Sequence, residues 1–166
     1  DGDSRRRRRR PSPEHRSISG WMHPQRSGRM TALGGGKVAS ETPQPGLLIT
    51  IVEDNPLIRQ LIAEEIEDEG HRVSSFSSAE DFLEVASNLC TDLILLDLML
   101  PGMDGLSCLR ELQQIPSRKL HRVVVVTALN DAATRQQALS LGAEDYILKP
   151  DLFERLPQLL GALTAN

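Results

Sequence analysis

Acidic, basic and hydroxyl side chains follow the ends of several apolar runs. They are Glu53 and Asp54, Asp97, Thr127 and Lys149. Three of them are carboxylic acids, and carboxylates a few ångströms apart raise one another's pKa unless a cation compensates them. Mg²⁺ is a suitable cation, because it takes oxygen ligands and is often held by one or two carboxylates together with phosphate. A lysine adds a charge suited to phosphate, and an aspartate can accept a phosphoryl group. These residue types predict a site for phosphate and Mg²⁺.

Asp97 follows a short apolar run, and turn residues follow Asp97. Leu93–Leu96 are all apolar, which is typical of a strand buried on both faces of a parallel sheet and is too short for a membrane span. Pro-Gly and Asp-Gly pairs in residues 98–105 predict a loop. Ligands bind at the carboxyl ends of strands in open parallel sheets, which makes Asp97 the leading candidate for a reactive group. The alternative is that Asp97 only caps the loop.

From residue 47 onward, β-rich apolar runs alternate with segments of helical periodicity. Five β-α units of this kind predict an α/β protein with a flavodoxin-like (βα)5 doubly wound parallel sheet, in the strand order 2-1-3-4-5. The strands that end at residues 52, 97 and 126 are the most apolar and are expected at its centre. Pro157 predicts that the last helix starts late or kinks. Strands are expected at 47–52, 72–76, 91–97, 122–127 and 144–150, and helices at about 56–69, 79–86, 105–115, 131–141 and 152–163.

The charge divides the chain into two parts. Residues 1–46 hold ten Lys and Arg against four Asp and Glu, a net charge of +6, and residues 47–166 hold nine against nineteen, a net charge of −10. The first part contains Arg5–Arg10 and no apolar periodicity, so it is expected to be a disordered basic N-terminal extension. The arginines lack interleaved aromatic residues, which argues for a solvated tail rather than a nucleic-acid site.

The basic extension also bears on targeting. No apolar segment follows the arginines, which argues against a secretory signal and leaves a transit peptide as an open alternative.

Residues 47–166 are enough for one hydrophobic core. Cys90 and Cys108 lack metal-ligand spacing and are expected to be reduced core or helix residues.

Residues 47–163 resemble the receiver domain of two-component response regulators, of which the chemotaxis regulators are a familiar type. The resemblance rests on a set of motifs in order along the five-fold β-α pattern. They are Glu53-Asp54 after the first strand, Asp97 with Pro101-Gly102-Met103-Asp104-Gly105, Thr127-Ala128, and Tyr146 with Lys149-Pro150.

The resemblance implies roles for the residues around the acidic cluster. Asp97 matches the phosphoryl acceptor and a Mg²⁺ ligand, Asp54 matches a direct Mg²⁺ ligand, and Glu53 matches a neighbour that acts through water. The backbone carbonyl of Met99 matches the remaining protein ligand. Two departures from the usual pattern are Glu53, where aspartate is common, and the apolar side chain of Met99, which is expected to restrict an attacking water.

The resemblance also implies a switch. Thr127 matches the hydroxyl that bonds the phosphoryl oxygens, and Lys149 matches the cation that pairs with them. Tyr146 matches the aromatic residue that turns inward as Thr127 moves. The family usually has a cis peptide at Lys149-Pro150.

The function implied is that of a phosphorelay receiver. A histidine kinase or histidine phosphotransferase would donate a phosphoryl group to Asp97 with Mg²⁺ as cofactor. The fourth helix, fifth strand and fifth helix would then change their affinity for a downstream protein partner or for a second copy in a homodimer. Such a chain is a cytoplasmic acceptor with intrinsic autodephosphorylation rather than a turnover enzyme, and no membrane or nucleic-acid partner is expected for it alone.

Other readings stay open at this stage. The chain could be the receiver fragment of a longer DNA-binding transcriptional regulator, or an inert pseudo-receiver that only binds partners. A haloacid-dehalogenase-like phosphatase is disfavoured, because it expects a second aspartate at the position of Met99. A flavodoxin-type cofactor binder is disfavoured because the loop after the first strand contains Glu53 and Asp54, which would repel a phosphate.

Overall fold

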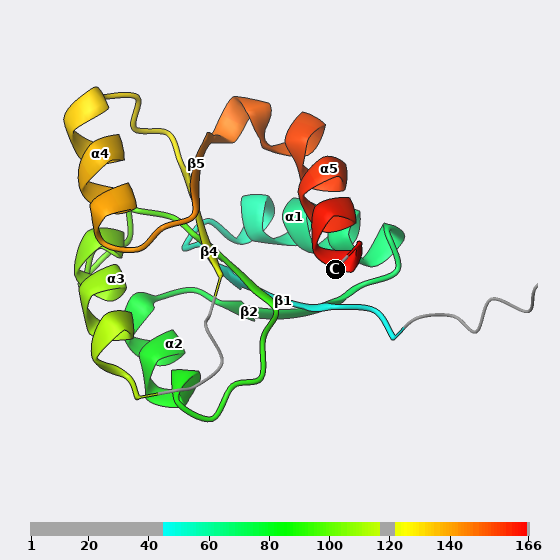
Figure 1. Ribbon diagram of the computed structural model, residues 1–166, viewed down its shortest axis with the longest axis horizontal. Helices are drawn as coiled ribbons and strands as arrows, with labels where there is room; N and C mark the ends of the chain where they lie inside the picture. The colour runs from blue at the N-terminus through cyan, green and yellow to red at the C-terminus, as the bar shows by residue number, and fades with distance from the viewer. Residues whose placement is uncertain (1–44, 117–121, 166) are drawn as a thin grey trace, which may run out of the picture. The chain divides into compact units, whose positions relative to one another are not determined.

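Five β-strands alternate with five α-helices in residues 45–116 and 122–165, which are the residues that this computed structural model describes (Figure 1). The basic extension expected at residues 1–46 lies outside the described residues except for its last two, so the domain boundary stays a prediction. The elements are β1 (Leu48–Val52), α1 (Pro56–Asp68), β2 (Arg72–Phe76), α2 (Ala79–Ala86), β3 (Leu93–Leu96), α3 (Gly105–Gln114), β4 (Val123–Thr127), α4 (Ala132–Ser140), β5 (Asp145–Leu148), the 3-10 helix η1 (Lys149–Asp151) and α5 (Leu152–Thr164).

The strands form one parallel sheet in the order β2-β1-β3-β4-β5, which confirms the predicted order and the central place of β1, β3 and β4. Val52 pairs with Leu96 at the carboxyl ends of β1 and β3. The register therefore brings the next residue of each strand, Glu53 and Asp97, to the same edge of the sheet. All the strands end at this edge because all of them are parallel.

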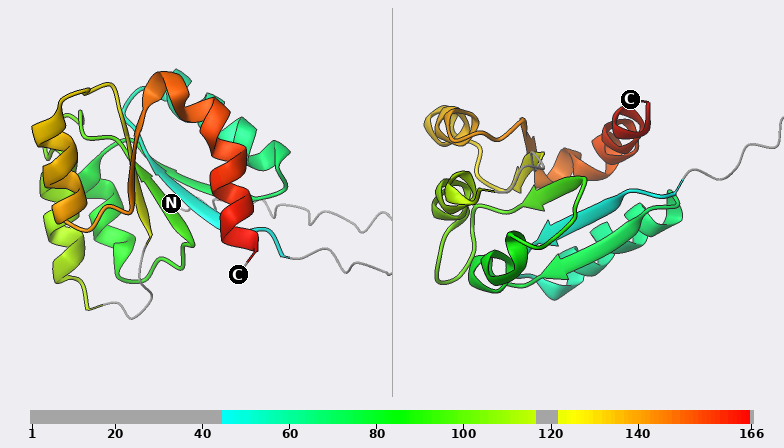
Figure 2. Two further views of the ribbon diagram at one scale, coloured as in Figure 1. Left: turned by 45° about the horizontal axis from the view of Figure 1, so that its top comes forward. Right: turned by 60° about the horizontal axis from the view of Figure 1, so that its bottom comes forward.

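Helices cover both faces of the sheet: α1 and α5 lie on one face, and α2, α3 and α4 lie on the other (Figures 1 and 2). The central strands are buried on both faces, and their successive side chains alternate between two core clusters. In β3, Leu93 and Leu95 join the cluster with α1 and α5, whereas Ile94 and Leu96 join the other. This alternation explains why β3 is apolar throughout.

Side-chain caps begin α1, α2 and α3 at the helix starts that the sequence predicts. The Asn55 side chain accepts hydrogen bonds from the N–H groups of Leu57 and Ile58 at the start of α1. Ser78 and Asp104 cap α2 and α3 in the same way. Such caps satisfy N–H groups that have no partner within the helix. The loops that carry the polar residues thus end at fixed points.

Two local predictions are wrong, and one pair of alternatives is narrowed. Pro157 predicted that the last helix starts late or kinks, and the late start does not occur, because α5 begins at Leu152 and contains Pro157. The fifth strand ends at Leu148 rather than at residue 150, since η1 follows it directly. Cys90 is exposed in the loop between α2 and β3, although Cys108 is buried in α3 as expected.

Among the described residues, no helix has the length and apolar character that crossing a membrane requires.

Candidate functional site

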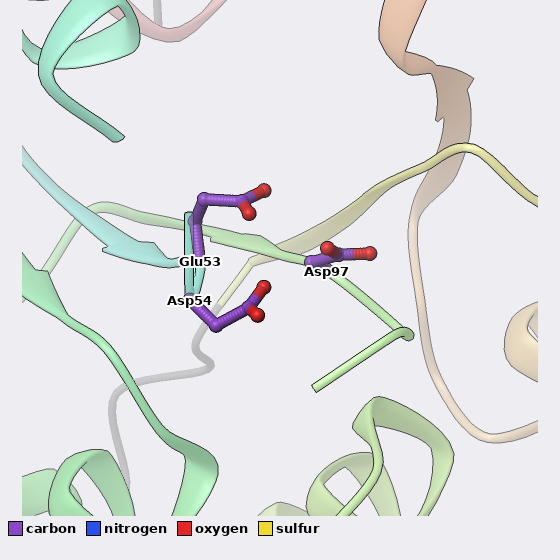
Figure 3. Close-up of side chains that lie close together, drawn as sticks. All are labelled: Glu53, Asp54 and Asp97. Carbon is purple, nitrogen blue, oxygen red and sulfur yellow. The ribbon is translucent and has the colours of Figure 1, made fainter. Parts of the chain in front are cut away.

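Three carboxylates meet at the carboxyl ends of β1 and β3 (Figure 3). One oxygen from each of Glu53, Asp54 and Asp97 lies within 4.8 Å of the other two. Glu53 and Asp97 are each only 2% exposed, whereas Asp54 is exposed. The sequence prediction that these residues converge is confirmed. The cluster has a buried half on the sheet and an open half that faces solvent.

Lys149 supplies the positive charge of the site from the start of η1. Its Nζ lies 2.8 Å from Glu53 Oε2 and 2.9 Å from Asp97 Oδ2. Burial raises the pKa of Glu53, and the hydrogen bonds from Lys149 and from the Asn55 N–H only partly oppose this rise. Burial works to lower the pKa of Lys149, but its bonds to the two carboxylates outweigh that effect and raise the pKa. Lys149 is therefore the counter-ion of the buried half of the cluster.

The carboxylate of Asp97 is held through both of its oxygens. Oδ2 accepts the hydrogen bond from Lys149, and Oδ1 accepts one from the Met99 N–H at 3.0 Å. The Asp97 N–H donates to the Val52 carbonyl at 3.0 Å and so continues the ladder between β1 and β3. These bonds fix both the backbone and the side chain of Asp97. The Met99 side chain is 55% exposed and points away from the core.

Arg59 in α1 holds the loop that carries Glu53 and Asp54, a role that the sequence did not reveal. Its Nη1 donates to the Glu53 carbonyl at 2.6 Å and to the Asp54 carbonyl at 3.3 Å. A cation that binds main-chain carbonyls leaves the carboxylates of the same residues available. No sequence pattern identifies such a contact, because the acceptors are backbone atoms.

Glu80 in α2 anchors the loop between β3 and α3. Its Oε1 accepts a hydrogen bond of 2.7 Å from the Met103 N–H, and this bond lowers the pKa of Glu80. The adjacent Gly102 has a φ of +74°, in the left-handed region that glycine adopts most readily. Glu80 is exposed and remote in sequence from the loop, so this contact was also missed. The bond between Glu80 and Met103 holds the loop that begins at Asp97 and includes Met99.

Gly105, the first residue of α3, packs against the backbone of Asp97 and Leu98. A Cβ atom at this position would lie 2.3 Å from the Asp97 carbonyl oxygen and 2.6 Å from the Leu98 Cα. Both neighbours are backbone atoms, so neither can move aside without displacing Asp97. The glycine at this point in the loop motif is therefore required for the close approach of α3 to the end of β3.

The Gly105→Ala variant should be less stable than the wild type by about 2 kcal/mol or more, as expected for overpacking at a rigid site. Urea unfolding measures the difference. The matched control is Gly161→Ala in α5, where an added Cβ meets nothing within 4 Å. Alanine there should be neutral or stabilising by up to about 1 kcal/mol, because glycine is the poorer helix former. Equal stability of the two variants would contradict the packing described for Gly105.

Thr127 and Tyr146 are joined through the backbone of Leu129. Thr127 is the last residue of β4 and is fully buried, and its Oγ1 accepts a hydrogen bond of 3.4 Å from the Leu129 N–H. Tyr146 in β5 is 2% exposed, and its hydroxyl donates to the Leu129 carbonyl at 2.7 Å. Tyr146 thus occupies the inward position. The sequence singled out both residues but not Leu129, whose contribution is made by main-chain atoms.

The cis peptide expected at Lys149-Pro150 is absent, since no peptide bond among the described residues is cis. Pro150 is the second residue of η1. The fixed φ of proline suits the first turn of a helix, and a trans bond is the lower-energy form before proline. The trans peptide is compatible with the contacts of Lys149 to Glu53 and Asp97.

The doubly wound parallel sheet in the order β2-β1-β3-β4-β5 places the chain in the flavodoxin-like α/β class. Within that class, the family model for the response regulator receiver domain matches residues 49–160, and the chain belongs to this family. This confirms the resemblance on which the sequence prediction rested.

Individual relatives agree with the family. The two-component response regulator PhoP of Pseudomonas aeruginosa is 36% identical over 115 residues, which are 69% of this chain and 50% of that protein. The signal transduction histidine-protein kinase BarA of Shigella flexneri is 35% identical over 121 residues, which are 72% of this chain and 13% of that kinase. The chain therefore spans half or less of the length of these relatives.

A solved structure also matches. The receiver domain of the sensor histidine kinase PA1611 from Pseudomonas aeruginosa PAO1 was crystallised with a magnesium ion in its active site cleft. It superposes with a TM-score of 0.65 at 28% identity, covering 73% of this chain and 99% of that domain.

Proposed function

We propose that the chain accepts a phosphoryl group on Asp97 from the phosphohistidine of a histidine kinase or histidine phosphotransferase. One observation carries the proposal: Asp97 is a buried carboxylate held by Lys149 and the Met99 N–H beside two further carboxylates. Membership of the receiver family supports the same reaction. The chain is then an acceptor with intrinsic autodephosphorylation rather than a turnover enzyme, and its expected cytoplasmic location belongs to the same proposal.

The reaction needs a positioned nucleophile and compensation of charge. An oxygen of Asp97 attacks the phosphorus, the bond from phosphorus to the histidine nitrogen breaks, and that nitrogen keeps the electron pair. Lys149 already contacts Asp97 Oδ2, so its charge lies where phosphoryl oxygens would arrive. Hydrogen bonds from the Met99 N–H and Lys149 keep the carboxylate oriented. The protein contributes orientation and electrostatic stabilisation, which are the main factors in phosphoryl transfer.

The acidic cluster fits Mg²⁺ by the chemistry of its donors. Its three members offer only oxygen ligands, and the exposed Asp54 leaves room for water, which Mg²⁺ retains in most protein sites. Asp54, Asp97 and the carbonyl of Met99 would hold the ion, with Glu53 acting through water. When bound, Mg²⁺ supplies positive charge that neutralises the phosphoryl oxygens.

Removing a metal ligand should weaken Mg²⁺ binding without affecting the fold. The Asp54→Ala variant should bind Mg²⁺ at least about tenfold more weakly than the wild type, since even outer-shell substitutions have effects of that size. Amide shifts followed during a Mg²⁺ titration measure the affinity. The matched control is Glu84→Ala, which removes an exposed carboxylate on α2 and should leave the affinity unchanged. Wild-type affinity in Asp54→Ala would rule out the proposed ligand set.

The direct test of the function uses acetyl phosphate as donor. The full chain with Mg²⁺ should gain one phosphoryl group that is stable in acid and labile in base, as an acyl phosphate is, and peptide mapping should locate it at Asp97. Chelation of Mg²⁺ should greatly slow the labelling. A folded chain that binds Mg²⁺ but takes up no phosphoryl group from acetyl phosphate or from a panel of histidine kinases would be an inert receiver.

The output proposed is a change at the surface of α4, β5 and α5. The Thr127 hydroxyl, whose oxygen accepts from the Leu129 N–H, would donate a hydrogen bond to a phosphoryl oxygen, and the Leu129 carbonyl accepts from Tyr146. The state of Asp97 would thereby reach β5 and α4. A downstream protein or a second copy of the chain would read this surface.

A further inference from the structure

Arg135 in α4 covers the ring of Tyr146. The guanidinium carbon lies 5.7 Å from the centroid of the ring, which is within cation–π range. Nη1 of the same side chain lies 3.5 Å from the Tyr146 carbonyl oxygen, a long contact that keeps the guanidinium over β5. Among the described residues, Arg135 forms no ion pair with an acidic side chain. Its polar contacts are therefore directed to Tyr146.

Tyr146 is held at two separate points. Its hydroxyl is bound to the Leu129 carbonyl at the end of β4, and its ring faces Arg135 from α4. Space remains beside the ring, because Arg135 and Tyr146 line a cavity together with Asn130, Asp131, Ala132 and Leu148. A ring with open space beside it can leave its inward position, so the contacts that hold it determine how often it does.

We propose that Arg135 is a positioning residue that holds Tyr146 inward and so links α4 to the state of β4 and β5. Arg135 itself is exposed, and a cation–π contact made at an exposed site changes the ratio of outward to inward Tyr146 by a factor of about two to five. The effect on Tyr146 itself does not depend on phosphorylation, whereas its consequence for signalling rests on the function proposed above.

The experiment measures the side-chain rotamer of Tyr146 directly. Tyr146 is the only tyrosine of the chain, so its signals are unambiguous. Three-bond couplings from its backbone nitrogen and carbonyl carbon to Cγ give the populations of χ1 on ¹³C,¹⁵N-labelled full-length protein. Solvent exposure of the ring is not a suitable readout, because removing Arg135 would uncover the ring even if the ring did not move.

Three variants separate charge from bulk. Arg135→Ala and Arg135→Met should both raise the ratio of outward to inward Tyr146 by about two- to fivefold. Arg135→Lys should restore part of the wild-type ratio, because it keeps the charge but not the planar group that stacks on the ring. The matched control is Gln137→Ala, which removes an exposed neutral side chain from the same helix and should leave the ratio at the wild-type value.

The outcome is decisive in either direction. Couplings in Arg135→Ala and Arg135→Met that equal those of the wild type would overturn the proposal, and so would an equal change in Gln137→Ala. Thermal melting confirms that each variant is folded. If the wild type takes up no phosphoryl group from acetyl phosphate, the proposed function fails, but the couplings still decide the role of Arg135.

Discussion

The Asp97→Asn variant should take up no phosphoryl group from acetyl phosphate under conditions that label the wild type fully. An amide oxygen is a far poorer nucleophile than a carboxylate, and the substitution also removes one of the three negative charges of the cluster. The asparagine side chain has nearly the same shape, and its one amide oxygen can still accept a hydrogen bond from either Lys149 or the Met99 N–H. The loss should therefore be chemical rather than structural, and intact-mass spectrometry measures it.

The matched control for this loss is Asp68→Asn, at an exposed position in the last turn of α1. It makes the same chemical change away from the site and should be labelled like the wild type. Equal labelling of Asp97→Asn and the wild type would mean that another side chain accepts the phosphoryl group. Labelling of neither the wild type nor Asp68→Asn would argue for an inert receiver.

Replacing Lys149 with methionine should destabilise the fold by about 3 kcal/mol at neutral pH, because removing one partner of a buried ion pair leaves the other charge uncompensated. Glu53 and Asp97 are each 2% exposed, and among the described residues Lys149 is the only cation that pairs with their side-chain carboxylates. Methionine keeps much of the length and apolar stem of the lysine. The loss should thus reflect the missing charge, and urea unfolding measures it.

The loss of stability caused by Lys149→Met should depend on pH in a defined direction. The pKa of Glu53 is raised above 4.5, so the folded protein binds this proton more tightly, and the contribution of Glu53 to stability falls as pH rises above 4.5. Without Lys149 the pKa of Glu53 should rise further, and protonation should relieve the repulsion. Lys149→Met should therefore lose more stability at about pH 7.5 than at about pH 5. The pKa of Lys149 is raised above 10.5, so its ammonium group stays charged across this range.

An exposed ion pair supplies the comparison for Lys149. Arg155 contacts Asp145 at 2.6 Å, but both side chains are accessible to solvent. Arg155→Met should cost no more than about 1 kcal/mol, because exposed pairs contribute little. If Lys149→Met at neutral pH were as stable as Arg155→Met, the carboxylates of the site would not depend on Lys149 for their compensation.

The central strands and their order could be predicted because burial on both faces requires uninterrupted apolar residues, as in Leu93–Leu96 and Val123–Val126. The effect of Pro157 on the start of α5 could not be predicted, because a late start and a kink both stayed open. Pro157 in a helix interior costs about 3 kcal/mol, whereas burying each large apolar side chain contributes about 1.5–3 kcal/mol. Leu152, Leu156 and Leu160 are all buried by the longer helix, and together they outweigh the proline.

The acidic cluster could be predicted because parallel strands end at one edge of a sheet, so that Glu53, Asp54 and Asp97 had to converge. Contacts made to main-chain donors and acceptors could not be predicted from the sequence, because every kind of residue supplies those atoms. Arg59 and Glu80 act on backbone groups, and the sequence separation between Glu80 and Met103 carries no periodic signal. Arg135 stands over Tyr146 only because α4 packs beside β5.

The connection of Thr127 and Tyr146 through the Leu129 backbone affects which substitutions this domain can tolerate during evolution. Thr127 and Tyr146 are connected through the N–H and the carbonyl of one residue, so any amino acid except proline can make both bonds. Substitutions at position 129 that preserve packing can therefore accumulate without breaking the connection. A connection made by main-chain atoms leaves no trace in aligned sequences at its central position, and only the structure reveals it.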